Sequence, residues 1–129
     1  DDLQNMQTGI FGYKGHVHFQ TAPCINEELE AFRGLPKTEV FARTASLIDH
    51  YIHLNYRLYP GNYIACDLVE GNQHFASRYT TEEVARFNTY LQKKLDMISL
   101  PDKDEEFLRK CMLTMYANPV INHQKALEE

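Results

Sequence analysis

Two histidines, His16 and His18, stand two positions apart in the run HVHFQT, and Cys24 follows shortly after. Residues at i and i+2 of a strand point to the same face, so the two imidazoles would lie side by side. Paired imidazoles can bind zinc, but zinc sites use three or four ligands, and the sequence offers no second ligand pair. A polar strand face covered by a helix or by water is the favoured interpretation, and we predict no metal site.

A second pair, His50 and His53, falls on the polar face of a long predicted helix. Asp49 and His53 are spaced i, i+4, which is typical of a weakly stabilising surface pair. General acid–base catalysis requires a cleft and a partner nucleophile, and the sequence shows no nucleophile elbow and no phosphate-binding glycine loop. A solvated helix face is therefore favoured, and we predict no catalytic residue and no cofactor.

Four tyrosines, Tyr51, Tyr56, Tyr59 and Tyr63, occur within thirteen residues. Such a cluster is typical of core edges whose hydroxyl groups reach water. The alternative is an aromatic wall that contacts a lipid or another ligand. We favour core edges, and both interpretations stay open at this stage.

Hydrophobic periodicity and capping signals predict a mainly α chain: one helical domain, residues 1–129, of about four to five helices with one short N-terminal strand or hairpin. The strand is predicted at residues 16–21, where apolar and polar residues alternate before a proline, and residues 1–15 as a loop. Helices are predicted at 26–33, 39–59, 62–70 (with a strand as the alternative), 80–100 after the capping box TTEE, and from a cap at Asp102 to a stop at Asn118–Pro119.

The helix at 39–59 is predicted to be the centre of the fold. At about 100° per residue, Phe41, Ile48 and Ile52 fall in one apolar sector, and a second apolar sector lies beside it. The combined arc is wider than the stripe of an ordinary surface helix, which indicates neighbours on two sides. For the last helix we predict a buried face formed by Phe107, Leu108, Cys111, Met112 and Met115.

The overall composition is that of a folded protein of the cytoplasm. The chain has 129 residues, of which 43% are hydrophobic and 24% charged, and a net charge of −5 argues against a nucleic-acid binder. No apolar run approaches the roughly 20 residues of a membrane span, and the opening residues predict no signal peptide. The three cysteines match no disulfide or metal spacing, so we expect reduced thiols.

The predicted strand has no evident partner in the chain. A lone strand leaves its backbone donors and acceptors unpaired, and even two-stranded hairpins are marginally stable in water. We therefore expect residues 1–25 to belong with an upstream domain of the same polypeptide. The alternative partner is a second copy of this chain, paired through the same strand in a homodimer.

The segment Gly15–Leu29 resembles the last conserved block of the bacterial lysophospholipid and glycerol-phosphate acyltransferase family, in which a strand and a proline precede a short helix rich in Glu and Leu. The stretch Asn55–Ala65 is similar to the C-terminal extension of one subgroup of that family. The resemblance implies a phospholipid-biosynthesis enzyme, peripheral to the inner membrane. It also implies that Val17, Phe19 and Pro23 form part of a substrate wall.

The sequence departs from that family at the catalytic motif. These acyltransferases use a His-x4-Asp pair as base and orienter, and the residues five positions after the six histidines are Thr21, Pro23, Asn55, Leu58, Tyr79 and Glu128. The arginine motif that binds glycerol phosphate is also missing. The resemblance therefore implies a C-terminal, non-catalytic portion of an acyltransferase, whose upstream domain carries the chemistry and any membrane contact. The alternative is a stand-alone helical interaction or regulatory domain without enzymatic activity.

Overall fold

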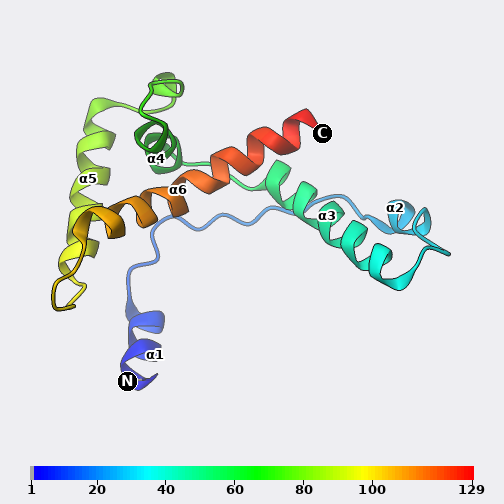
Figure 1. The fold of residues 1–129 in the computed structure, drawn as a ribbon, viewed down its shortest axis with the longest axis horizontal. Helices are drawn as coiled ribbons and strands as arrows, with labels where there is room; N and C mark the ends of the chain where they lie inside the picture. The colour runs from blue at the N-terminus through cyan, green and yellow to red at the C-terminus, as the bar shows by residue number, and fades with distance from the viewer. Residues whose placement is uncertain (1) are drawn as a thin grey trace.

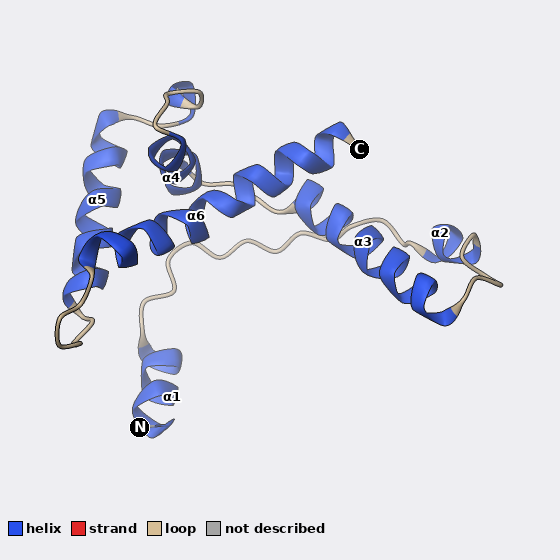
Figure 2. Cartoon of the chain, viewed as in Figure 1, coloured by secondary structure: helices blue, strands red, loops and turns tan. Residues whose placement is uncertain are grey.

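The computed structural model describes residues 2–129, and in that range it contains six α-helices, one short 3₁₀ helix and no β-strand (Figures 1 and 2). The prediction of a mainly helical fold is confirmed. The elements in chain order are α1 Asp2–Phe11, α2 Asn26–Glu30, α3 Lys37–Asn55, α4 Pro60–Glu70, η1 Ala76–Arg78, α5 Thr81–Asp96 and α6 Glu105–Glu128.

The short N-terminal strand predicted at residues 16–21 is wrong. These residues belong to an irregular segment, residues 13–25, which we call the strap, and residues 13–24 are all exposed. Within residues 2–129, no backbone N–H of residues 13–24 finds a hydrogen-bond partner. Alternation alone does not make a strand, because a strand needs a ladder and every regular element described here is a helix.

The centre of the fold is α4. Its four consecutive residues Ile64, Ala65, Cys66 and Asp67 are all buried, because α6, α5 and η1 pack around this short helix. The helix prediction at 62–70 is confirmed, and Gly71 ends the helix in the left-handed conformation (φ +66°). Ala65 of α4 and Ala117 of α6 are fully buried where the two helices meet, and these small side chains allow the two helix backbones to approach closely.

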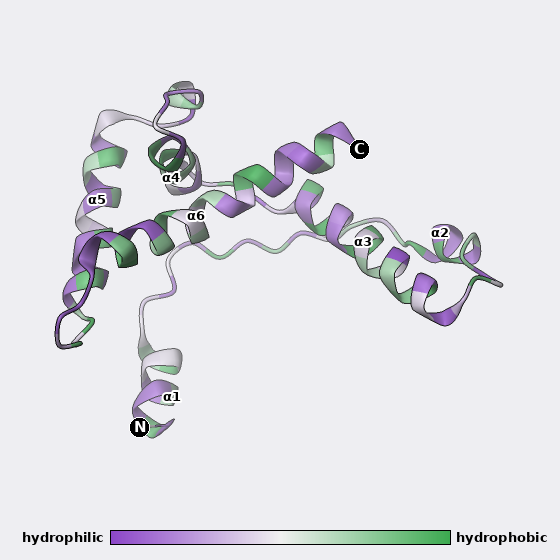
Figure 3. Ribbon diagram, in the orientation of Figure 1, coloured by the Kyte–Doolittle hydropathy of each residue, from purple (hydrophilic) through white to green (hydrophobic). Residues whose placement is uncertain are grey.

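The prediction that the long helix is central is wrong. The helix α3 has no fully buried residue and packs mainly against α6, while Ile48 and Ile52 are 43% and 52% exposed. It also ends at Asn55, four residues earlier than predicted, because a residue before proline is driven out of the helical region and Pro60 is favourable as the first residue of α4. Figure 3 shows hydrophobic residues along α3, and Figure 1 places that helix away from α4 and α5.

A buried carboxylate closes the turn after α4. Asp67 accepts hydrogen bonds from the backbone N–H of Phe75 at 3.1 Å and from the hydroxyl of Tyr79 at 2.6 Å. The bond to Asp67 raises the pKa of Tyr79 to about 12. A buried carboxylate without such donors would destabilise the fold, so these bonds fix η1 against α4.

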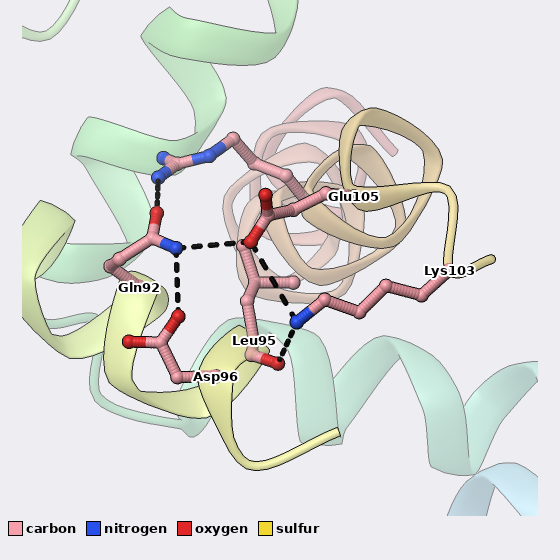
Figure 4. Close-up of polar contacts among 6 residues, drawn as sticks. Gln92, Leu95, Asp96, Lys103 and Glu105 are labelled. Atoms are coloured by element: carbon pink, nitrogen blue, oxygen red, sulfur yellow. Dashed lines mark hydrogen bonds and ion pairs between the residues drawn. The ribbon is translucent and has the colours of Figure 1, made fainter. Parts of the chain in front are cut away.

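The corner between α5 and α6 is held by polar side chains (Figure 4). The amide of Gln92 donates to Asp96 at 3.0 Å and to Glu105 at 3.1 Å, and Lys103 Nζ donates to the Leu95 carbonyl at 3.1 Å. The capping box at Thr80–Glu83 that begins α5 is confirmed.

The cap of the last helix is Asp104 rather than the predicted Asp102. The carboxylate of Asp104 accepts from the Phe107 N–H at 2.9 Å, whereas Asp102 adopts a positive φ of 53° in the preceding turn. Both acids stand within three residues of the helix, so the local sequence does not distinguish them.

The last helix also continues through the predicted stop at Asn118–Pro119. A proline inside a helix costs about 3 kcal/mol, and here the burial of Val120 and Ala126 after it offsets that cost. The predicted buried face of this helix is wrong as well, because Phe107 and Met115 are largely exposed. The face toward α4 is formed by Leu113, Tyr116, Ala117 and Val120.

Residues 2–11 form the helix α1, where a loop was predicted. All ten of its residues are exposed, and α1 projects away from the other helices (Figure 1). Asp1 lies outside the described residues. None of the described helices is long and apolar enough to cross a membrane.

The peripheral position of α3 can be tested with two large-to-small substitutions. Leu95→Ala removes a fully buried side chain of α5 and should lower the free energy of unfolding by about 2–5 kcal/mol. Ile52→Ala removes a half-exposed side chain of α3 and should cost less than about 1 kcal/mol. Urea denaturation measures the free energy of unfolding of both variants. An equal loss for Ile52→Ala and Leu95→Ala would contradict the peripheral position of α3.

The burial of Cys66 predicts an unreactive thiol. Burial and the nearby carboxylates of Glu70 and Asp67 raise the pKa of Cys66 to about 11, so at pH 8 it stays protonated, and the thiolate is the reactive form. With a thiol-specific disulfide reagent at pH 8, the exposed Cys24 and Cys111 should react quickly and Cys66 only in denaturant. Cys66→Ser should remove only the thiol that becomes reactive in denaturant, and the fast reaction of the other two thiols should be unchanged. Three equally fast thiols would contradict the packing of α4.

Candidate functional site

A groove of about 700 Å³ lies between the strap and the C-terminal half of α3. Its floor continues into the link between α3 and α4. The residues that line this groove, which we call the α3 groove, are His16, Val17, His18, Phe19, Gln20, Ala22, Pro23, Ile25, Ile48, Tyr51, Ile52, Asn55, Tyr56, Arg57 and Tyr59.

The apolar wall of the groove joins two segments that are far apart in the sequence. Ile48 and Ile52 lie one turn apart on α3, and Val17 and Pro23 face the same space from the strap. All three residues predicted for a substrate wall, Val17, Phe19 and Pro23, line this groove. Phe19 is 90% exposed, which places its ring at the rim.

Two tyrosines position this wall. The hydroxyl of Tyr51 donates to Glu28 Oε1 of α2 at 2.7 Å, and this bond lowers the pKa of Glu28 and raises that of Tyr51. The hydroxyl of Tyr56 donates to the carbonyl of Pro119, and burial raises the pKa of Tyr56. The two hydrogen bonds therefore fix α2 and α6 against α3 on either side of the groove.

Polar groups gather around Tyr59 at the other end of the groove. The Arg57 guanidinium carbon lies 5.4 Å from the centre of the Tyr59 ring, and the His16 ring lies 5.7 Å from it. The Tyr59 hydroxyl is buried without a hydrogen-bond partner among the described residues. A buried donor without a partner is costly, so an acceptor that reached the Tyr59 hydroxyl would be stabilised by it.

The side chains that line the groove include one arginine and no carboxylate. None of its lining residues is Asp or Glu, although the whole chain has a net charge of −5. Arg57 forms no ion pair with another residue in the range 2–129, and neither His16 nor His18 forms a hydrogen bond there.

The pair His50 and His53 does not reach the groove. His50 Nδ1 lies 2.9 Å from Glu129 Oε2, and the carbonyl of His53 accepts from His123 Nδ1 at 2.7 Å. This helix face was predicted to be solvated, yet both histidines are partly buried and help to dock α3 on α6. His123, in the second half of α6, is part of the same contact.

Sequence reasoning missed Arg57, Asn55 and Ile25 as groove residues. Arg57 and Asn55 stand inside the stretch Asn55–Ala65, but no local pattern separates a groove arginine from a surface arginine. Among residues 2–129, no group of three or more His, Cys, Asp or Glu side chains could hold a metal ion.

No protein-family model, no curated protein and no solved structure matches this chain.

Proposed function

We propose that this chain is the C-terminal, non-catalytic portion of a phospholipid-biosynthesis acyltransferase, and that its α3 groove receives the acyl chain of a substrate. The observation that carries the proposal is the apolar groove itself. The strap residues Val17 and Pro23, which lie in the segment that resembles the acyltransferase block, face Ile48 and Ile52 across it. A largely apolar concavity of about 700 Å³ lies within the usual range of small-ligand sites.

The chemistry of acyl transfer is assigned to an upstream domain of the same polypeptide. Transfer to an alcohol requires a base that takes the hydroxyl proton and a group that orients the base. The sequence has no His-x4-Asp pair, and the groove histidines hydrogen-bond to no nucleophile within residues 2–129. In this proposal the helical part holds the acyl chain, and the enzyme as a whole is cytoplasmic and peripheral to the inner membrane.

A second candidate is a helical interaction domain without enzymatic activity. It is favoured by exposed apolar side chains outside the groove, among them Met6 and Ile10 of α1 and Phe41 of α3. Exposed apolar patches commonly mark protein-binding surfaces. The partner in this case is another protein or a second copy of the chain, paired through the unpaired backbone of strap residues 16–21.

A binding measurement separates the two candidates. The chain should bind a fluorescent long-chain fatty acid, and Ile52→Glu should weaken binding by at least about 10-fold, because the new carboxylate lies where the acyl chain would exclude water. Phe41→Glu is the matched control: Phe41 lies on the same helix, is 62% exposed and does not line the groove. Equal effects of the two substitutions would favour a general apolar docking face.

The chain on its own should transfer no acyl group. Incubation with acyl donors and lysophospholipid acceptors should yield no more product than buffer, because no base–orienter pair is present. Turnover by the chain that a single histidine substitution abolishes would overturn the non-catalytic assignment.

A further inference from the structure

We infer that the α3 groove selects a single-chain amphiphile with an anionic head, and that the head lies against Arg57, His16 and Tyr59. The inference rests on the proposed function, in which the groove receives an acyl chain, and it adds the charge and the orientation of the ligand. The shared head chemistry is an oxyanion, which a carboxylate or a phosphate can supply.

The first ground is charge complementarity. In a chain with 18 acidic and 13 basic residues, the α3 groove is lined by one arginine, two histidines and no acid. The guanidinium of Arg57 has no ion-pair partner in residues 2–129. The ion pairs that the fold does contain join residues outside the groove. Planar guanidinium groups bind carboxylate and phosphate through two parallel hydrogen bonds, so Arg57 is suited to an oxyanion.

The second ground is the Tyr59 hydroxyl. It is buried and finds no hydrogen-bond partner among residues 2–129, and the same ring lies within 6 Å of both Arg57 and His16. Phenol O–H groups in such places usually have an acceptor, and an oxyanion brought in by Arg57 would supply one. A small shift of the strap, whose residues 13–24 are exposed and have unpaired backbone N–H groups, would open the hydroxyl to the ligand.

The third ground is the order of polar and apolar residues along the groove. From the polar end at Tyr59, the groove passes Ile52 and then Ile48 along α3. At about 1.5 Å per residue, Ile48 lies about 10 Å from the C-terminal end of the helix at Asn55. A ligand with one charged end and one apolar tail therefore matches the groove in a single orientation.

Three ligands with the same acyl chain test the inference below their micelle concentrations: a fatty acid, a 1-acylglycerol phosphate and a neutral monoacylglycerol. Isothermal calorimetry should give both anions an affinity on the order of 10-fold above that of the neutral ligand, and added salt should reduce the difference. Arg57→Gln should bring the anions down to the affinity of the neutral ligand. Arg86→Gln, at an exposed arginine of α5 outside the groove, should leave the preference in place.

The outcomes separate the inference from the proposed function. Equal binding of all three ligands, or equal effects of Arg57→Gln and Arg86→Gln, would overturn the anion selection while leaving an acyl-binding groove. The absence of binding by any of the three would overturn both. A preference for the phosphate over the carboxylate, or the reverse, supports the inference and identifies which oxyanion the groove takes.

Discussion

The close packing of α4 against α6 is the constraint on which the rest of the structure depends. Ala65 of α4 and Ala117 of α6 are fully buried members of one cluster, and small side chains let two helices approach without a cavity. Asn62 strengthens the contact because its amide donates to the Tyr116 carbonyl at 3.0 Å while its oxygen caps the N-terminus of α4. The helices α3, α5 and η1 pack against one or both members of this pair.

The continuity of α6 through Pro119 decides where α3 can lie. The second half of α6 receives the Tyr56 hydroxyl at Pro119 and presents His123 to the carbonyl of His53. These contacts hold the C-terminal end of α3 through the backbone carbonyl of His53 and the side chain of Tyr56. The apolar residues Ile48 and Ile52 are not part of them and remain about half exposed. The same arrangement that leaves α3 out of the core makes it available as the wall of a groove.

The α3 groove combines an apolar wall with two polar groups that have no partner among residues 2–129. Arg57 forms no ion pair in that range, and the buried Tyr59 hydroxyl finds no hydrogen-bond partner there. An acyl chain with an anionic head is the ligand that we propose for this combination, and we assign the chemistry of acyl transfer to an upstream domain.

The sequence by itself determined the features that act over a few residues: the helical class, the capping box at Thr80, the helix at 62–70 and its end at Gly71. These depend on backbone preferences that neighbouring residues settle. Only the tertiary structure decided that α3 is peripheral, that α6 passes Pro119 and that residues 16–21 form no strand. The position of α3 depends on which helix buries its face, and the course of α6 depends on packing after Pro119 that offsets the cost of the proline. A strand at residues 16–21 would need a second strand to form a ladder, and the described residues contain none. The groove belongs to the same group, since Val17 and Pro23 meet Ile48 and Ile52 only after the strap has folded back along α3.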